Sequence, residues 1–574
     1  MLLQDSRRLT GPNLLSRRPG AVVEAAFAGA EAEGLIGAWR RQARRMLDAV
    51  GWREEELAVR RFGGGASLFL SAPIDVLYAA TEVGEWAWEA AAAAAGGAGE
   101  PEAETFAAAT ERLRGVIARE RDPALLAMRD AAAAHGVSFL ADDEQATVGL
   151  GAGSSTWPRG ELPPPQAVDW APVRDVPVAL VTGTNGKSTT VRLTAAMLTA
   201  AGRVAGMTTT DGIAVGRAVL DAGDYSGPGG ARTLLRDRRV EAAVLETARG
   251  GLLRRGLALE RVDAAAVTNV AADHLGGYGI EDLAGLAETK LLVTRAVAPA
   301  GRAVLNADDA ELAARGTRGP SPVTWTSLDP QRAAAAGLDL GAHLAAGGDA
   351  ALLDGERLVL ARAGSRREVV ATAGDVPIAF GGAARYNVAN ALAAIGLAAA
   401  LEVPVEAMAA GLAALRNEDG SDNPGRGCLM EIDGFHALLD YAHNPHGLEA
   451  LIAFAGSLPA RRRLVVLGQA GDRSDQAIRD LVQTAWRLRP ERVIVKELPT
   501  MLRGRRPGEV PALLEAELLR LGARRDTLTH AATEVDAVLQ ALDWALPGDL
   551  LLLLIHTQRD EAMALLHQRR GGRR

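Results

Sequence analysis

A short glycine-containing loop between an apolar strand and a helix limits the possible folds of this chain more than any other segment. Residues 178–181 are an apolar run, residues 181–190 read VTGTNGKSTT, and apolar residues at helical spacing follow. In such a loop the backbone N–H groups point at phosphate oxygens, and the helix N-terminus adds a favourable dipole. Lys187 would place a charge beside the β- and γ-phosphates, and the Ser188 hydroxyl would hold Mg²⁺.

The loop predicts a nucleotide site of the P-loop type in an α/β fold, in a shortened form. The usual pattern places its first glycine where this chain has Val181, which is still part of the strand. A generic glycine-rich turn is the alternative, but strand, loop, GKS triplet and helix all occur in register. The residues predicted to bind the nucleotide are Gly183, Thr184, Asn185, Gly186, Lys187, Ser188 and Thr189.

Two further strand ends carry polar residues that fit the same site. Glu246 follows the apolar run 242–245, so it should lie at the strand's carboxyl end, where a buried carboxylate is costly unless it faces a cation. A surface glutamate is the alternative. His274 is a candidate for a second Mg²⁺ or a nucleotide contact, although a histidine after a strand more often serves as a structural hydrogen-bonding group. Spacing alone indicates that Lys290, on the next helix, is a solvated lysine.

The chain divides into three blocks. Its 574 residues exceed one core and suggest three or four domains at roughly 150 residues each. Residues 1–150 are predicted to form a mostly helical α+β domain, with helical spacing at 102–134, GGAGEP at 96–101 and a strand at 67–70. Residues 151–169 are rich in Gly, Ser and Pro and show no periodicity, which predicts an extended linker.

Residues 170–415 alternate strands with helices, which predicts a parallel sheet covered by helices. Residues 416–574 repeat this pattern and predict a smaller doubly wound domain. The predicted strands after 178–181 are 242–245, 264–267, 303–305, 437–441, 464–467, 492–495 and 550–555, with hairpins in 350–380 and a helix at 387–401.

Composition excludes several classes of protein. Hydrophobic residues make up 48% and charged residues 23%, which is the balance of a folded globular chain and not of a disordered one. A net charge of −8 argues against nucleic acid as the partner. No run approaches the ~20 apolar residues of a membrane span, and the opening residues lack the apolar core of a signal peptide. The only cysteine, Cys428, fits a reducing compartment, so we expect a cytoplasmic protein.

Several motifs together resemble the Mur ligase family. They are GTNGKST, the strand end at Glu246, the pair Asp273–His274 and the later Lys290. ARYNVANALAA (384–394) is similar to a family segment that usually has histidine where this chain has Tyr386. NPGR (423–426), DYAHNP (440–445) and GDRSD (471–475) are similar to the C-terminal signatures of the family.

Within that family, the chain resembles the Mur-type half of the cyanophycin synthetases. The opening RRLTGPN (7–13) also resembles the start of their N-terminal domain. Those enzymes carry an ATP-grasp domain where this chain has only the predicted linker, so the resemblance implies at most the Mur-type ligation step. The similar segments are TTTDGI (208–213), SGPGGARTLL (226–235), LETARGGLLRRGL (245–257), NVAADHLGGYGI (269–280) and KELPTMLRGRRPGE (496–509).

The resemblance implies ATP and Mg²⁺ as cofactors and an acyl-phosphate mechanism. Ser188 and Glu246 would hold one Mg²⁺ and His274 a second, while Lys187 would neutralise the β- and γ-phosphates. Lys290 matches a family lysine that is often carbamylated. The resemblance therefore implies a lysine that faces the metal, whereas spacing alone indicates a solvated one. The resemblance also implies that Asn387 contacts the adenine, Arg426 the phosphates and Asp440 the ribose, and that His443 orients the nucleotide or the acyl phosphate.

The substrates are predicted only as a class. Arg249, Arg254 and Arg255 and the segment TTTDGI lie where the family binds its acceptor, and arginines there suit a carboxylate-bearing amino acid or peptide, unless they pair with acids of the chain itself. The alternatives are a glutamate-adding ligase and a catalytically silent nucleotide-binding partner of a separate ATP-grasp ligase. Further copies of the chain, in a homo-oligomer, are among the partners considered. The sequence determines neither the amino acid added nor the oligomeric state.

Overall fold

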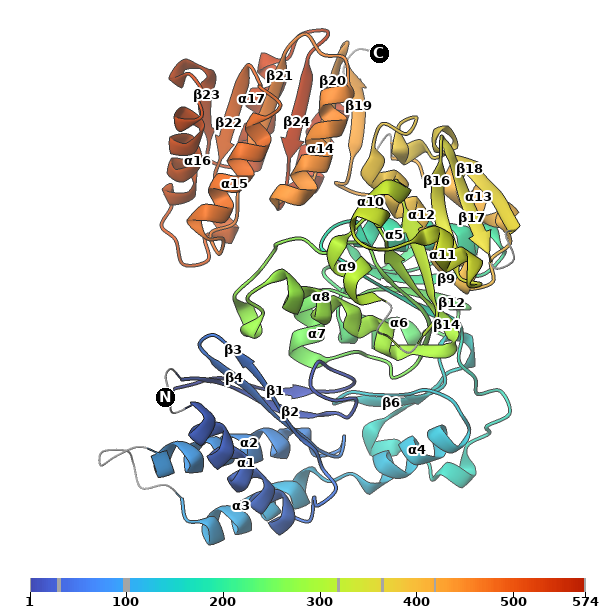
Figure 1. Ribbon diagram of the computed structural model, residues 1–574, viewed down its shortest axis with the longest axis vertical. Helices are drawn as coiled ribbons and strands as arrows, with labels where there is room; N and C mark the ends of the chain where they lie inside the picture. The colour runs from blue at the N-terminus through green and yellow to red at the C-terminus, as the bar shows by residue number, and fades with distance from the viewer. Residues whose placement is uncertain are drawn as a thin grey trace.

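The computed structural model describes residues 2–27, 32–95, 104–316, 319, 321–362, 366–417 and 420–571. Three sheet-centred bodies follow one another along the long axis of the molecule (Figure 1). The N-terminal body lies at one end, the central sheet in the middle, and the C-terminal sheet at the other end. The predicted α/β class with three parts is confirmed, while the exact domain boundaries stay predictions.

The N-terminal body is an antiparallel four-stranded sheet with helices packed on it. The strand order is β1-β2-β4-β3, and the sequence predicted only the strand that became β4. The predicted helical stretch 102–134 is two helices separated by Arg121 and Asp122, and residues 96–103 lie outside the described part of the chain. The elements are β1 Leu2–Leu9, β2 Gly20–Ala26, α1 Ala32–Ala49, β3 Leu57–Phe62, β4 Gly65–Ser71, α2 Leu77–Ala95, α3 Phe106–Glu120 and α4 Pro123–Ala134.

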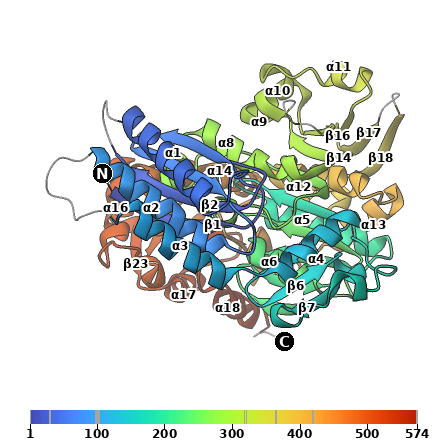
Figure 2. The same cartoon turned by 90° about the horizontal axis from the view of Figure 1, so that it is seen from below.

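Part of the predicted linker is a strand, β7. A small antiparallel sheet is formed by three strands: β5 (Phe139–Ala141), β6 (Gln145–Val148) and β7 (Ser155–Pro158). The hydroxyls of Thr147 and Thr156 lie 3.0 Å apart across β6 and β7. Thr147 also accepts a hydrogen bond from Arg236 of the central body, so this sheet joins the two bodies (Figure 2).

The central body is an eleven-stranded mixed sheet, where the sequence predicted a parallel one. Strands β9, β12, β8, β13, β14, β15 and β16 run parallel, and antiparallel hairpins extend both ends, including those predicted for 350–380. The strands are β8 Val178–Thr182, β9 Ala205–Thr209, β10 Gly212–Val215, β11 Ala218–Ala222, β12 Ala242–Glu246, β13 Val262–Val267, β14 Val297–Asn306, β15 Val323–Ser327, β16 Asp349–Asp354, β17 Arg357–Arg362 and β18 Arg366–Thr372.

Helices cover both faces of this sheet, which explains the unbroken apolar character of its middle strands. Along β8, Ala179 and Val181 pack with α5, α12 and α13, whereas Val178 and Leu180 pack on the other face with α6, α7 and α8. The helices are α5 Lys187–Ala200, α6 Pro228–Leu235, α7 Arg249–Arg255, α8 Leu283–Leu291, α9 Ala310–Arg315, α10 Pro330–Ala335, α11 Leu340–Ala345, α12 Arg385–Ala400 and α13 Val405–Ala414.

The C-terminal body is a six-stranded sheet in the order β19-β20-β24-β21-β22-β23, parallel except for the β19–β20 hairpin. The four predicted strands are confirmed, and the edge strands β19 and β23 were not predicted. The elements are β19 Cys428–Ile432, β20 Phe435–Asp440, α14 Pro445–Ser457, β21 Arg463–Leu467, α15 Asp475–Trp486, β22 Arg492–Lys496, α16 Glu509–Arg520, β23 Leu528–Ala531, α17 Glu534–Trp544, β24 Leu550–Leu554 and α18 Arg559–Gly571. No described helix is long and apolar enough to cross a bilayer.

A buried ion pair lies at the carboxyl end of this sheet. Lys496 and Glu534 are both fully buried and in contact, and Lys496 also donates to the carbonyl of Leu554. Burial lowers the pKa of Lys496 to about 8, although Glu534 opposes this shift. The pair holds together the ends of β22 and β24 and the start of α17.

Replacing Lys496 by methionine is expected to lower the free energy of unfolding by about 3 kcal/mol, because it leaves the Glu534 carboxylate buried without its cation. Urea denaturation followed by circular dichroism measures the change. The double variant Lys496→Met with Glu534→Gln is the matched control. It should be more stable than the single variant, since it no longer buries an unpaired charge. Equal stability of Lys496→Met and the wild type would contradict the assignment.

Candidate functional site

The predicted phosphate loop joins β8 to α5 and has the backbone of an anion cradle. Gly183 and Gly186 have φ values of +151° and +85°, which favour glycine. A Cβ at Gly183 would lie 1.8 Å from the Thr268 hydroxyl oxygen. Lys187 Nζ donates to the carbonyls of Gly183 and Thr184, at 3.2 and 3.1 Å. The lysine thus folds back over its own loop, with its amine where a bound phosphate would sit.

Ser188 and Glu246 meet as predicted, and they fit a divalent cation. Ser188 Oγ donates to Glu246 Oε2 over 2.6 Å, and the glutamate is 2% exposed. The other carboxylate oxygen, Oε1, is buried with no hydrogen-bond partner among the described residues. A buried carboxylate oxygen without a donor is stabilised by a cation. Since the described residues contain no cluster of three acidic, histidine or cysteine side chains suited to a metal, a cation here would also need oxygens from the nucleotide.

Lys290 is buried, so its interpretation as a solvated lysine is wrong. The side chain is 3% exposed on α8. Burial and the nearby charge of Lys187 lower its pKa well below the usual value, although Asp273 acts in the opposite direction. Helical spacing could not reveal this because the burial of Lys290 depends on the elements that pack against α8, among them α7 and α9. A neutral amine beside Lys187 is the form that can react with carbon dioxide.

His274 and His443 come together around Asp273, although they belong to different bodies. His443 Nε2 lies 3.5 Å and Arg473 Nη1 3.0 Å from the carboxylate of Asp273. Burial raises the pKa of Asp273, but the hydrogen bond from His443 and the charge of Arg473 outweigh it, so the pKa lies well below its usual value. Burial lowers the pKa of His274 to about 4, so the ring is neutral at pH 7. Its Nε2 accepts from Arg473 at 2.9 Å, and its predicted metal contact stays a prediction.

The C-terminal body supplies further predicted residues at the same crevice. Asp440 accepts the N–H groups of Gly427 and Ala442, both at 2.7 Å, and burial raises its pKa to about 6. Asn444 and Asn185 exchange two amide hydrogen bonds, at 3.0 and 3.1 Å, so the phosphate loop touches the DYAHNP segment directly. The phosphate loop and the C-terminal signature therefore meet at one interface between the bodies.

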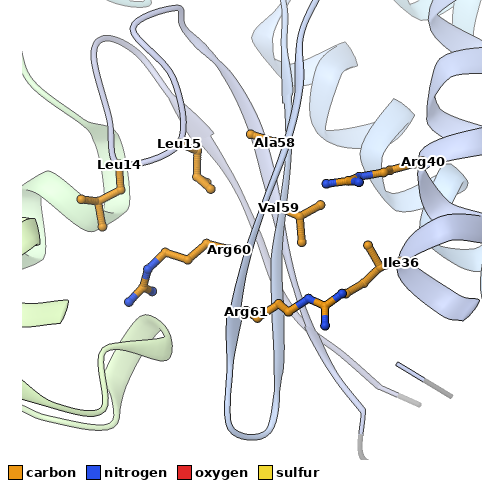
Figure 3. Close-up of a pocket in the computed structure, with 8 residues that line it drawn as sticks. All are labelled: Leu14, Leu15, Ile36, Arg40, Ala58, Val59, Arg60 and Arg61. Carbon is orange, nitrogen blue, oxygen red and sulfur yellow. The ribbon is translucent and has the colours of Figure 1, made fainter. Parts of the chain in front are cut away.

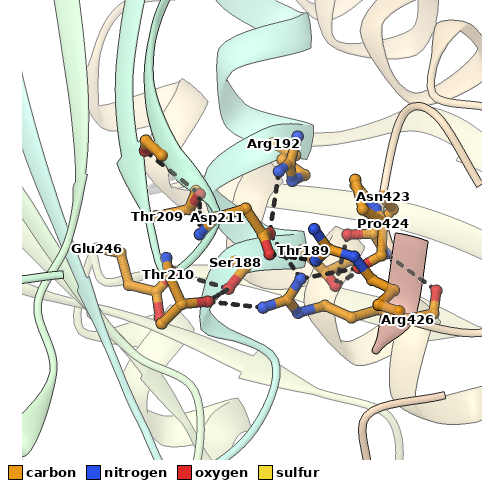
Figure 4. A network of polar contacts seen from close by, with 12 residues as sticks. Ser188, Thr189, Arg192, Thr209, Thr210, Asp211, Glu246, Asn423, Pro424 and Arg426 are labelled. Carbon is orange, nitrogen blue, oxygen red and sulfur yellow. Dashed lines mark hydrogen bonds and ion pairs between the residues drawn. The ribbon is translucent and has the colours of Figure 1, made fainter. Parts of the chain in front are cut away.

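Two predicted nucleotide contacts are engaged with protein groups. Asn387 donates to the carbonyl of Ile378 at 2.7 Å and accepts from Asn390, so its contact with adenine stays a prediction. Arg426 donates through Nη1 to Asp211 at 2.7 Å and through Nη2 to the Thr210 hydroxyl, also at 2.7 Å. Figure 4 shows Arg426 beside Thr210, Ser188 and Glu246, which is the side of the loop where a phosphate would lie.

Several residues of this crevice escaped the sequence reasoning. Thr210 and Asp211 were noted only as part of TTTDGI, and Arg192 lies one helical turn after Ser188. Arg473 was visible in the GDRSD segment, but nothing in its spacing pointed to Asp273. Arg559, at the start of α18, had no motif at all, and only the folded chain brings it to Asp211, at 2.6 Å.

The chain contains only three lysines, Lys187, Lys290 and Lys496, beside 60 arginines. Two of the three lie in this crevice, and the third is the buried partner of Glu534. A compact ammonium that loses its proton readily differs in chemistry from a guanidinium. Because arginine is used almost everywhere else, the three remaining lysines indicate positions where lysine itself is needed. The composition alone could have given this indication.

A cleft of about 860 Å³ lies between the N-terminal sheet and the central body. Arg254 and Arg255 of α7 line it, together with Arg7, Arg8 and Tyr78 from the N-terminal body and the glycines at the start of α6. Within the described part of the chain, neither Arg254 nor Arg255 pairs with a carboxylate, and they donate to the carbonyls of Gly250 and Arg8. Burial, then the charges of Arg8 and Arg254, lower the pKa of Arg255. Three aspartates, Asp5, Asp142 and Asp224, also line the cleft, so its unpaired positive charge is that of Arg254 and Arg255.

Arg249 does not line this cleft. Its guanidinium donates to the carbonyl of Gly277 at 2.6 Å, and burial lowers its pKa. A second pocket, of about 500 Å³, lies on the N-terminal body and is lined by apolar side chains and by Arg40, Arg60 and Arg61 (Figure 3). Of these, Arg60 reaches the carbonyl of Tyr278 at 3.4 Å, so it also contacts the central body.

Comparison with known proteins agrees with this geometry. Residues 181–398 match the Mur ligase middle domain, and residues 425–554 match the Mur ligase, glutamate ligase domain. The cyanophycin synthetase of Trichormus variabilis is 37% identical over 396 residues, which are 69% of this chain and 42% of that protein. The UDP-N-acetylmuramyl-tripeptide synthetase of Roseiflexus sp. (strain RS-1) is 31% identical over 404 residues, covering 67% of this chain and 74% of that protein.

Among solved structures, E. coli FolC in complex with DHPP and ADP is similar, with a TM-score of 0.49 and 19% identity over 68% of this chain and 88% of that chain. The chain spans less than half the length of the cyanophycin synthetases that it matches.

Proposed function

This chain belongs to the Mur ligase family, and on that premise we propose that it is an ATP-dependent ligase that joins a carboxylate to an amine. The γ-phosphoryl group of ATP passes to a carboxylate oxygen of the acceptor, and ADP leaves. The amine of an amino acid then attacks the carbonyl carbon of the acyl phosphate, loses a proton and displaces phosphate. The product is an amide or isopeptide bond.

The observation that carries this proposal is the pairing of Ser188 with Glu246 directly beside Lys187 and Arg426. It supports a cation site beside a phosphate cradle, with two positive side chains in the same crevice. Phosphoryl transfer needs little covalent help from the protein, and positioning with charge stabilisation supplies most of the acceleration. The crevice lies between two bodies, so their closure excludes the water that would hydrolyse an acyl phosphate.

Most of the predicted residues have a role in this scheme. Lys187 neutralises the β- and γ-phosphates, and Arg426 stabilises charge on the transferred group. His443, held by Asp273, orients the nucleotide or the acyl phosphate. Ser188 and Glu246 would hold Mg²⁺, which polarises the phosphate oxygens when bound. Asp440 and Asn387 remain the candidates for the ribose and the adenine.

Lys290 is proposed to be carbamylated. The motif match to the family supplies this idea, and the burial of the side chain supports it, because the unprotonated amine reacts with carbon dioxide. A carbamate would give this position a negative charge beside Lys187. Lys187 and Arg249, whose charges act on Lys290, would then face an anion in place of an amine.

We also propose that the acceptor is an acidic amino acid or peptide held in the arginine-lined cleft. Arg7 and Arg8 are ion-paired within the N-terminal body, but the guanidiniums of Arg254 and Arg255 have no carboxylate partner among the described residues. Charge-assisted hydrogen bonds from arginine to carboxylates are strong and directional. Arg7, Arg8 and Tyr78 come from the N-terminal body, which gives that body a role in recognising the acceptor. Of the two relatives, one is a cyanophycin synthetase, which fits an aspartate-containing acceptor.

The double variant Arg254→Ala with Arg255→Ala is expected to raise the KM for an acidic acceptor about 30-fold, because two charge-assisted contacts are lost. The KM for ATP should not change. Steady-state phosphate release with varied acceptor measures both constants. Arg238→Ala, which removes an exposed arginine of the same body, is the matched control. An unchanged acceptor KM in the double variant would remove the cleft from the proposal.

A phosphate-release screen tests the function. Purified protein, ATP and Mg²⁺ are incubated with each amino acid and with short aspartate-containing peptides, and the products are identified by mass spectrometry. We expect release only when a matched acceptor and amino acid are both present. A response to glutamate alone would favour a glutamate-adding ligase. No release with any pair, while nucleotide still binds, would favour a silent partner of a separate ATP-grasp ligase.

A further inference from the structure

Asp211 binds three guanidinium groups, two of which come from the C-terminal body. Its carboxylate accepts from Arg426 at 2.7 Å, from Arg559 at 2.6 Å and from Arg192 of α5 at 3.1 Å. Figure 4 shows Arg192 and Arg426 meeting at Asp211 from different elements. The aspartate therefore ties the central body to two separate segments of the C-terminal body, one before β19 and one after β24.

The backbone of Asp211 is held by hydrogen bonds within its own turn, independently of the arginines. Asp211 lies in the turn between β9 and β10, and its N–H donates to the Thr209 hydroxyl at 3.1 Å. Its carbonyl accepts from Gly223, and the next residue, Gly212, has a φ of +154°, which favours glycine. Burial raises the pKa of Asp211, but the charges of Arg426 and Arg192 outweigh it and hold the pKa below its usual value. A rigid, charged acceptor of this kind can define where a long arginine side chain ends.

The contact decides which way Arg426 faces. Asp211 takes Nη1, which leaves Nη2 on the Thr210 hydroxyl, at 2.7 Å. That hydroxyl is 3.4 Å from Ser188 Oγ, and Ser188 donates to Glu246. Nη2 is thus the arginine nitrogen nearest to the phosphate and cation site. One carboxylate for three guanidiniums leaves an excess of positive charge, so Arg426 can hold Asp211 and an incoming phosphate together.

We propose that Asp211 is a positioning residue for the ligase reaction: it holds Arg426 and Arg559 across the interface so that closure delivers Nη2 of Arg426 to the transferred phosphoryl group. The proposal rests on the proposed function for its catalytic part. Arg559 makes its ion pairs with Asp211 and Asp560, so we assign it to the contact between the two bodies and not to the phosphate. We call the contact of Asp211 with Arg426 and Arg559 the tether. This separation allows the tether to be tested without touching the residues that bind ATP.

The test compares Asp211→Asn, Arg559→Gln and the double variant. Asp211→Asn is expected to lower kcat about 30-fold, because a partly buried charge pair across an interface is lost. The KM for ATP should change less than about threefold, since the phosphate loop is intact. Arg559→Gln should lower kcat about fivefold, and the double variant should be no worse than Asp211→Asn. Effects that multiply in the double variant, or an unchanged kcat in Asp211→Asn, would overturn the proposal.

Asp549→Asn is the control that distinguishes a positioning role of Asp211 from a purely structural one. This variant breaks the ion pair with Arg462 inside the C-terminal body, and it should lower the melting temperature while kcat stays within about twofold of the wild type. The tether also has a readout that needs no turnover. Dyes on Arg217→Cys and Ala516→Cys, both exposed positions, report the distance between the two bodies, and the native Cys428 is buried.

With ADP and Mg²⁺ present, Asp211→Asn should broaden the distance distribution and the wild type should keep a narrow one. Equal distributions would reject the tether even if the ligase activity is established. A broadened distribution in a protein that releases no phosphate would support the tether and reject the proposed function instead. The two ideas therefore fail in different measurements.

Discussion

Replacing Lys187 by alanine is expected to abolish ATP turnover, with a loss of at least about 1000-fold in phosphate release. The Nζ atom is the positive group inside the phosphate loop, and its hydrogen bonds to described residues are to the carbonyls of Gly183 and Thr184. Removing a preorganised cation from the path of the transferred charge raises the barrier directly. The measurement is the single-turnover release of phosphate with a matched acceptor and amino acid.

The fold should survive this change. Lys187 is only partly buried and its hydrogen bonds are to its own loop, so the melting temperature should stay close to that of the wild type. Lys187→Arg is the matched control: it keeps the charge but not the compact shape, and it should recover only a small part of the rate. Turnover in Lys187→Ala within about tenfold of the wild type would mean that the nucleotide reacts elsewhere.

The Glu246→Gln variant is expected to lower kcat/KM about 100-fold and to raise the Mg²⁺ concentration needed for half-maximal rate. The amide keeps the size of the side chain and its contact with Ser188, but it has no negative charge for the cation. The buried Oε1, which has no donor among the described residues, is the atom expected to meet the metal. A titration of rate against Mg²⁺ at saturating ATP gives both changes.

Glu241→Gln is the control for this variant, since Glu241 lies at the opposite end of the same strand and accepts only a backbone N–H. It should behave as the wild type. If Glu246→Gln has an unchanged Mg²⁺ requirement, the cation binds elsewhere and the pairing of Ser188 with Glu246 is a structural hydrogen bond.

The sequence predicted the parts of the fold that follow from strong local patterns. The strands in the middle of the central and C-terminal sheets are unbroken apolar runs, because both faces of each sheet are covered, and such runs can be recognised from the sequence alone. Edge strands β19 and β23 and the N-terminal strands β1 to β3 lack it, since they mix polar and apolar residues and depend on their neighbours. The strand β7 was missed because Pro and Gly around it are typical of a linker.

The site was predictable where one motif carries one function. The phosphate loop and the strand end at Glu246 are local features, and the structure brings them within hydrogen-bond distance. Residues that act only through long-range contact gave no local signal: Arg559 and Asp211 are far apart in the chain and meet only when the C-terminal body lies on the central one. The burial of Lys290 is of the same kind, because it depends on what packs against α8.

The scarcity of lysine gives this protein an internal chemical reporter. Reagents that acylate side-chain amines find Lys290 and Lys496 buried and only Lys187 within reach of solvent. Modification of Lys187 should slow when nucleotide fills the loop, and labelling of the other two should require the crevice to part or the C-terminal sheet to unfold. Peptide mass spectrometry distinguishes the three lysines, so one labelling experiment can report nucleotide binding at Lys187, opening of the crevice at Lys290 and unfolding of the C-terminal sheet at Lys496.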